Sequence, residues 1–183
     1  MPVPDFSPGE VLTAAAMDSI GLWLVKTQTV TSGTSVVVTG AFSSTYDNYY
    51  VTYTGGVSST AAALTLQLGP SSVGGYNAGY YAGVVGTFYS SDSLNYVRDN
   101  NATSWTTAGG AYTDGAILSM FLYNPANSSR KTLMAINRID VRTGGAAGTG
   151  NGFHNTAAAY TDFTLTSTAT LTGGVVRVYG FRN

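Results

Sequence analysis

Residues 61–69, AAALTLQLG, decide the fold class of this chain. Leu64, Leu66 and Leu68 alternate with Thr65 and Gln67, so one side of an extended segment is apolar and the other is polar. Successive side chains of a β-strand point to opposite faces of its sheet. The stretch therefore predicts a strand with one face in a core and one face in water.

The same two-residue period continues on both sides of this stretch. It is clear in NYYVTYTGG (48–56), KTLMAINRIDVR (131–142), FTLTST (163–168) and GGVVRVYGF (173–181). Gly-rich turn signals separate these segments. About seven to nine antiparallel strands predict a mainly β fold, an antiparallel β-sandwich of jelly-roll type.

Three other stretches refine this expectation. Residues 116–124, AILSMFLYN, are apolar on both sides, which predicts a central strand covered on both faces. Residues 70–88 and 143–156 are too rich in glycine for regular strands, and we expect long surface loops there.

The N-terminal residues carry helix signals instead. Ser7 and Glu10 fit a capping box with Pro8 at the first helical position, and Gly21 is placed to end the helix. We expect one short helix within residues 8–20, too short to be stable alone in water. Its apolar side must therefore be buried, against either the following domain or another subunit. The predicted organisation is an N-terminal segment with this short helix, residues 1–27, followed by a β-sandwich domain, residues 28–183.

Composition excludes several classes of protein. Charged residues make up 9% of the chain, compared with about 25% in an ordinary soluble domain. The net charge of −1 and the scattered basic residues argue against nucleic-acid binding. There is no cysteine, and no apolar run approaches the roughly 20 residues that span a bilayer. The N-terminus lacks the basic-then-apolar pattern of a secretory signal, so we expect neither export nor membrane insertion.

The sequence offers no convincing catalytic or metal-binding set. A Ser–His–Asp arrangement could use only His154, with Asp162 nearby in sequence, and a lone histidine is more often a hydrogen-bonded loop residue. The acidic residues lie mostly in turn-like contexts, where Asp usually bonds the backbone. Residues 99–115 are only suggestive of a Ca²⁺ loop. We therefore expect no enzyme activity, no cofactor and no metal.

Aromatic residues form the more informative group. Several lie in or beside stretches rich in Asn, Ser and Gly, and such amphipathic rings suit recognition of proteins or sugars. The alternative is that these rings cover the core and hydrogen-bond the loops; the sequence leaves both interpretations open. The candidate recognition residues are Tyr76, Tyr80, Tyr81, Tyr89, Tyr96 and Trp105.

The segment FSPGEVLTAAAMDSIGLWLVKTQTV (6–30) resembles the N-terminal segment of many tailed-bacteriophage virion proteins. The match is carried by Phe6, the run from Gly9 to Ala15, and Met17; Asp18 stands where Asn is common. The C-terminal GGVVRVYGFRN resembles the closing strand of the same modules. The middle of the chain agrees only in style, and no catalytic residue is carried over.

The resemblance implies a virion structural protein, usually a homotrimer, whose N-terminal segment docks to the particle. The implied attachment residues are Phe6, Val11, Leu12, Ala15, Met17, Ile20, Leu22 and Trp23. Expected partners are other copies of the chain, other virion proteins and a host surface glycan or protein. The expected location is the virion, assembled in the host cytoplasm.

Three functions stay open at this point. The leading one is a component of the tail or fibre apparatus with a role in host adsorption. The second is a capsid decoration or head-fibre protein. The third, of another class, is a lectin-like carbohydrate-binding module that uses the loops around residues 76–89 and Trp105.

Overall fold

The computed structural model describes residues 21–69, 74–84, 94–139 and 146–181. In these residues the chain forms no helix and eleven strands, all in one antiparallel sheet. The strands are β1 (Leu22–Thr29), β2 (Ser32–Val38), β3 (Asn48–Ser58), β4 (Ala62–Leu68), β5 (Tyr76–Val84), β6 (Leu94–Ala102), β7 (Trp105–Tyr112), β8 (Gly115–Tyr123), β9 (Lys131–Ile139), β10 (Ala146–Ala157) and β11 (Phe163–Phe181). The prediction of a mainly β, antiparallel fold is confirmed.

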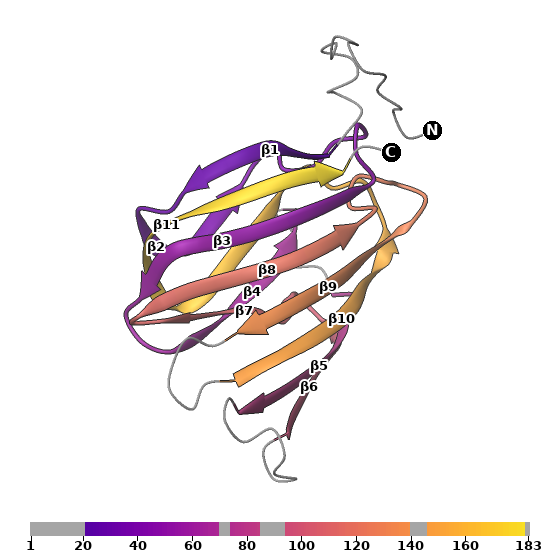
Figure 1. The fold of residues 1–183 in the computed structure, drawn as a ribbon. Coiled ribbons are helices and arrows are strands. Elements are labelled where there is room, and N and C mark those ends of the chain that lie inside the picture. The colour runs from indigo at the N-terminus through magenta and orange to yellow at the C-terminus, as the bar shows by residue number, and fades with distance from the viewer. Residues whose placement is uncertain (1–20, 70–73, 85–93, 140–145, 182–183) are drawn as a thin grey trace, which may run out of the picture.

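The longest strand, β11, organises the sheet because it pairs with four others. Its C-terminal half lies between β1 and β3, where Tyr179 is paired with Leu24 and Tyr50. Its N-terminal half lies between β2 and β4. β2 follows β1 in the chain, and β4 follows β3. The β1–β2 run, the β3–β4 run and β11 therefore each pass from one part of the sheet to the other, and they bend at about the same place (Figure 1). The sheet therefore folds over on itself.

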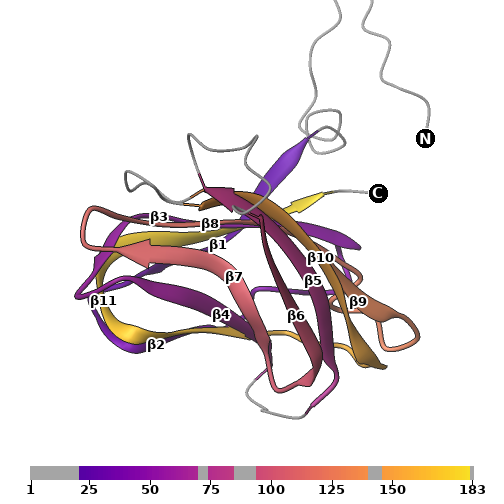
Figure 2. The ribbon, with the colours of Figure 1, turned by 90° about the horizontal axis from the view of Figure 1, so that it is seen from below.

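This bend divides the sheet into a front half and a back half. The front half holds β1, the C-terminal half of β11, β3, β8, β9, β10, β5 and β6, and the back half holds β2, the N-terminal half of β11, β4 and β7. A closed ring of pairings joins them: β11 with β3, β3 with β8, β8 with β7, β7 with β4, and β4 with β11. In Figure 2, β2, β4 and β7 lie beneath β3 and β8.

Glycines make the bend possible. Gly174 has a φ of +84°, and a Cβ on it would lie 2.5 Å from the Gly56 nitrogen and 2.7 Å from the Thr54 oxygen. The adjacent Gly173 has a φ of +71°, and its carbonyl accepts a hydrogen bond of 2.8 Å from the Tyr53 hydroxyl. Glycine is favoured at these two positions because it adopts a left-handed backbone conformation without strain and because it has no Cβ to keep the strands apart.

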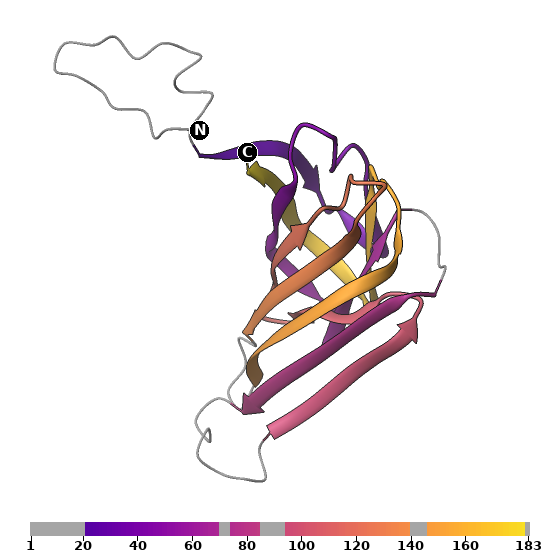
Figure 3. The same ribbon diagram turned by 90° about the vertical axis from the view of Figure 1, so that its right-hand side faces the viewer.

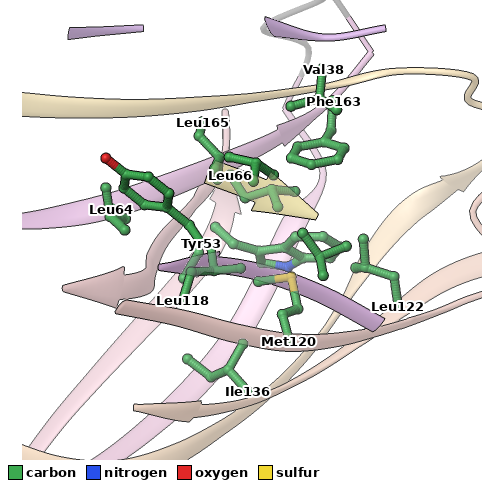
Figure 4. Close-up of a cluster of buried hydrophobic side chains, with 14 of the residues drawn as sticks. Val38, Tyr53, Leu64, Leu66, Leu118, Met120, Leu122, Ile136, Phe163 and Leu165 are labelled. Carbon is green, nitrogen blue, oxygen red and sulfur yellow. The ribbon is translucent and has the colours of Figure 1, made fainter. Parts of the chain in front are cut away.

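The core lies between the two halves. Tyr53 and Met120 reach into it from the front half, and Leu66 and Phe163 face them from the back half (Figure 4). All four side chains are fully buried. Burial of a side chain of this size contributes about 1.5–3 kcal/mol relative to leaving it exposed. The leucines of residues 61–69 point into the core, as predicted.

Both Gly-rich stretches that were expected to be surface loops contain strands. β5 lies within residues 70–88, and β10 covers most of residues 143–156. β10 pairs with β5 on one side and β9 on the other. Its glycines serve close packing, because a Cβ at Gly150 would overlap the ring of Tyr80. This correction raises the number of strands above the seven to nine predicted.

The first strand begins earlier than the predicted domain boundary. Residues 22–27, which the sequence assigns to the N-terminal segment, belong to β1 and pair with β11. Leu22 is paired with Phe181, so the described chain enters and leaves the sheet at one corner (Figure 3). The helix expected within residues 8–20 lies outside the described residues, and the jelly-roll sandwich stays a prediction.

We predict that Gly174→Ala destabilises the fold much more than Gly40→Ala. Gly40 also has a positive φ, +64°, but no atom lies within 4 Å of the place where its Cβ would stand. Gly40→Ala should cost about 1 kcal/mol for the left-handed backbone alone, and Gly174→Ala about 3 kcal/mol or more because the strands must also separate. Urea unfolding of both variants measures this difference, and equal costs would contradict the role given to the bend.

Candidate functional site

The outer face of the front half is the surface turned away from the core and toward the viewer in Figure 1. Strand register places apolar side chains side by side across it. One row runs from β1 to β10 through the paired residues Leu22, Phe181, Asn48, Tyr123, Leu133 and Phe153. A parallel row runs through Leu24, Tyr179, Tyr50, Phe121, Ala135 and Asn151. We call the side chains of these two rows the outer face.

Aromatic contacts tie the two rows together. The ring of Tyr50 lies 4.8 Å from that of Phe121 and 6.4 Å from that of Tyr179, centroid to centroid. The rings of Phe121 and Phe181 are 5.9 Å apart. Such pairs contribute about 0.5–1.5 kcal/mol beyond their burial. The rings therefore form a connected and ordered platform.

Much of this platform is open to solvent. Five of its side chains are 36–55% exposed: Leu22, Leu24, Tyr123, Leu133 and Phe153. Together they expose roughly 400 Å² of apolar surface, a size at which a patch on a monomer is often functional. Isolated exposed leucines need no explanation, but a contiguous set does.

The outer side of β8 is apolar although it is partly exposed to solvent. Residues 116–124 predict a strand covered on both faces, and β8 does lie in the middle of the front half. Its inner side chains, such as Leu118 and Met120, are buried, whereas Phe121 is half-buried and Tyr123 is exposed. In the described part of the chain, no strand packs on this outer side. The sequence is thus apolar where the described structure provides no cover.

The charge on the strands of the outer face has one sign. β1, β3, β8, β9, β10 and β11 contain no Asp or Glu. Lys131 stands beside the apolar rows, with its Nζ 5.4 Å from the centre of the Phe153 ring and donating to Asn155 Oδ1 at 2.7 Å. Arg177 lies two residues before Tyr179, on the same side of β11. The face therefore suits a partner that is apolar and acidic.

The structure places three of the six candidate recognition aromatics in the core. Tyr76 and Trp105 are 1% and 0% exposed and pack edge to face, with ring centroids 5.1 Å apart. Tyr80 is also buried. For these three residues the structure agrees with the second interpretation, in which the rings cover the core. Tyr81 is exposed, on the same side of the front half as the outer face.

Tyr89 and the Tyr96 side chain lie outside the described residues. The backbone of Tyr96 belongs to β6 and pairs with that of Tyr81. The structure therefore brings these two positions together at one edge of the front half.

Tyr80 takes part in a buried polar contact that the sequence does not indicate. Its hydroxyl donates to Asp99 Oδ2 at 2.7 Å, and Asp99 also accepts from the Thr106 N–H at 2.9 Å and the Thr106 hydroxyl at 2.6 Å. These bonds join β5, β6 and β7. Burial, and then the adjacent carboxylate, raise the pKa of Tyr80. Asp99 therefore links three strands in the interior of the protein.

The single histidine is buried and hydrogen-bonded, but in a strand. His154 of β10 lies 3.0 Å from the Tyr160 hydroxyl and 3.3 Å from the Thr156 carbonyl oxygen, both measured from Nδ1. Asp162, its possible triad partner, instead accepts a hydrogen bond of 2.7 Å from the Gly40 N–H. Within the described ranges no group of three or more His, Asp or Glu side chains could hold a metal ion.

A polar hollow of about 260 Å³ lies between the loops that precede β3 and follow β8. Ser44, Asp47, Asn124 and Asn127 are among its lining residues, and Asp47 is the one carboxylate among them. A lone carboxylate beside amides and hydroxyls defines no reaction. The outer face is the stronger candidate for a functional site.

The predicted attachment residues divide between described and undescribed positions. Phe6, Val11, Leu12, Ala15, Met17 and Ile20 lie outside the described residues. Leu22 opens the first row of the outer face and is 44% exposed. Trp23 is half-buried, and its Nε1 is a buried donor with no hydrogen-bond partner in the structure.

Sequence reasoning did not single out Tyr50, Phe121, Tyr179 and Phe181, which form the centre of the outer face. Alternation with a period of two places these residues on the side of each strand opposite the core. On that side, a single aromatic residue in a sequence does not indicate a binding site. The useful signal was the doubly apolar segment 116–124, because it predicted a cover for Phe121 and Tyr123.

Comparisons with known proteins add no identification. No protein-family model, no curated protein and no solved structure matched the chain. In the part of the chain that the structure describes, no helix has the length and hydrophobicity needed to cross a membrane.

We predict that the fold loses stability in alkali. Burial raises the pKa of Tyr49, Tyr53, Tyr76, Tyr80 and Tyr160, whereas an unfolded tyrosine titrates near about 10. The stability that these neutral phenols contribute is complete below about pH 10 and falls as the pH rises toward their folded pKa values. Each phenol kept protonated should lower the free energy of unfolding by about 1.4 kcal/mol per pH unit in that window.

Urea unfolding between about pH 8 and about pH 11 measures this loss. Tyrosinate absorbance should rise together with the loss of β circular dichroism. Tyr76→Phe should show a shallower fall with pH. Ionisation of all tyrosines while the sheet stays folded would refute the prediction.

Proposed function

We propose that this chain is a structural protein of a bacteriophage virion, most directly a subunit of the tail or fibre apparatus that serves host adsorption. The observation that carries the proposal is the outer face, an apolar platform with no cover in the described chain. A charge-poor surface of this kind is suited to permanent contacts in an assembly. The resemblance of residues 6–30 to the attachment segments of phage virion proteins supplies the identity of the assembly.

In this proposal the leader, defined here as residues 1–20, is the attachment element. The leader precedes β1 in the chain, and β1 begins at the corner where β11 ends. Its apolar residues need a partner surface, since a helix of that length is unstable alone. In the same proposal, the folded sheet projects outward from the particle, and it is a jelly-roll sandwich.

A capsid decoration or head-fibre protein is the alternative within the same particle, with the same fold on outer shell sites. Copy number distinguishes the two. Hundreds of copies per particle indicate the shell, and a handful to a few dozen indicate the tail. Quantitative mass spectrometry of purified particles measures this number.

The lectin-like module is the alternative of another class. Of the aromatic residues in the loops proposed for it, around residues 76–89 and Trp105, Tyr76, Tyr80 and Trp105 are buried. Glycan binding would therefore have to use other residues, such as the exposed Tyr81. A glycan array probed with the full chain tests this alternative.

We predict that the leader is required for incorporation into particles. Deletion of residues 1–20 removes the proposed attachment element and leaves β1 and the described core residues in the chain. The full chain, supplied to particles assembled without it, should sediment with them, and the truncated chain should stay in solution. Circular dichroism of the truncated chain controls for folding. Normal incorporation of a folded truncated chain would overturn the proposal.

We predict that a charge on the outer face also lowers incorporation. Leu133→Asp places a carboxylate among the apolar rows at a position that is 44% exposed, so the core is untouched. Val37→Asp is the matched control, because Val37 is 52% exposed on β2, away from the outer face. The same sedimentation assay should show a loss for Leu133→Asp only.

A further inference from the structure

The geometry points to a specific occupant for the outer face: the leader of a neighbouring copy of this chain. The inference rests on the proposed function, in which copies of the chain are neighbours in an assembly, and it names the surface to which the leader docks.

The size of the exposed surface fits a segment better than a whole subunit. The five most exposed side chains of the outer face present roughly 400 Å². A standard protein–protein interface buries about 800 Å² on each partner. A short amphipathic segment laid across apolar rows is an established way to cover a smaller surface.

The predicted helix of the leader is nearly as long as the outer face is wide. Five strand spacings separate β1 from β10 in the order β1, β11, β3, β8, β9, β10, which is about 24 Å. A helix over residues 8–20 would be about 20 Å long. Its apolar side carries Val11, Leu12, Ala15 and Ile20, so its apolar contacts can extend over about 14 Å, more than half of that width.

The charges of the two partners are opposite. The leader contains Asp5, Glu10 and Asp18 and no Lys or Arg. On the side of the outer face, the six strands carry Lys131 and Arg177 beside the apolar rows, and none of these strands contains an acidic residue. An apolar and acidic segment thus meets an apolar surface with basic side chains beside it.

A leader that docks on the outer face of a neighbouring copy makes the same contacts as a leader that docks on the outer face of its own chain. This exchange of an identical element between copies is domain swapping. Each copy offers one leader and one outer face, so head-to-tail docking leaves no face empty in a closed ring. β1 is the edge strand of the front half and carries the leader. A copy packed beside β1 is therefore within reach.

Disulfide trapping tests this inference, because the chain contains no cysteine of its own. Two full-length variants, Ala15→Cys and Leu133→Cys, are purified separately, mixed and oxidised. The control mixture replaces Leu133→Cys with Val37→Cys, a similarly exposed position away from the outer face. We expect a disulfide-linked pair of chains in several-fold higher yield from the first mixture than from the control. Adding Lys131→Glu and Arg177→Glu to the Leu133→Cys chain should lower the yield roughly threefold.

Equal yields from the two mixtures would overturn the inference. So would a double variant, Ala15→Cys with Leu133→Cys, that links only within single chains, because the leader would then dock on its own subunit. The trapping uses purified chain without particles, whereas the proposed function is tested by sedimentation with particles. A chain that joins particles but gives no specific cross-link retains the function and loses this docking site.

Discussion

The bend of β11 at Gly173 and Gly174 is the constraint on which the rest of the structure depends. One strand serves two halves of the sheet because its backbone can turn there and because Gly56 of β3 leaves room for it. The halves then face each other, and the side chains on their inner surfaces form the core. A side chain at the bend would force the paired strands apart, and the core would lose its second wall.

The same bend determines which surface is left without cover. Folding the sheet over protects one side of the front half, where Tyr49, Val51 and Tyr53 are fully buried. The opposite side of the same strands keeps its aromatic rows. Those rows combine apolar surface, stacked rings and basic neighbours, and so the outer face has the chemistry of a binding surface rather than of an ordinary solvated sheet.

How much was predictable depended on the kind of signal. The period-two leucines of residues 61–69 gave the strand and its buried side correctly, because alternation follows directly from strand geometry. The glycines of residues 143–156 led to a wrong prediction of a loop, because glycine is favoured both in turns and where strands pack closely. Only the structure shows that the ring of Tyr80 packs against Gly150, so that close packing is the reason for the glycine there. Burial of Tyr76 and Trp105 could not be read from their polar neighbours, since it depends on contacts between β5 and β7 that are distant in sequence. The outer face needed register across six strands, which no local pattern contains.

The pairing of Leu22 with Phe181 has a mechanical consequence. Because β1 and β11 are antiparallel and meet at one corner, a force that draws the two ends apart acts on one pair of residues at a time. The hydrogen bonds between β1 and β11 would then break one after another at low force, whereas bonds that are loaded at the same time resist a higher force. A module that must bear tension is therefore better held through the broad outer face than through its two ends.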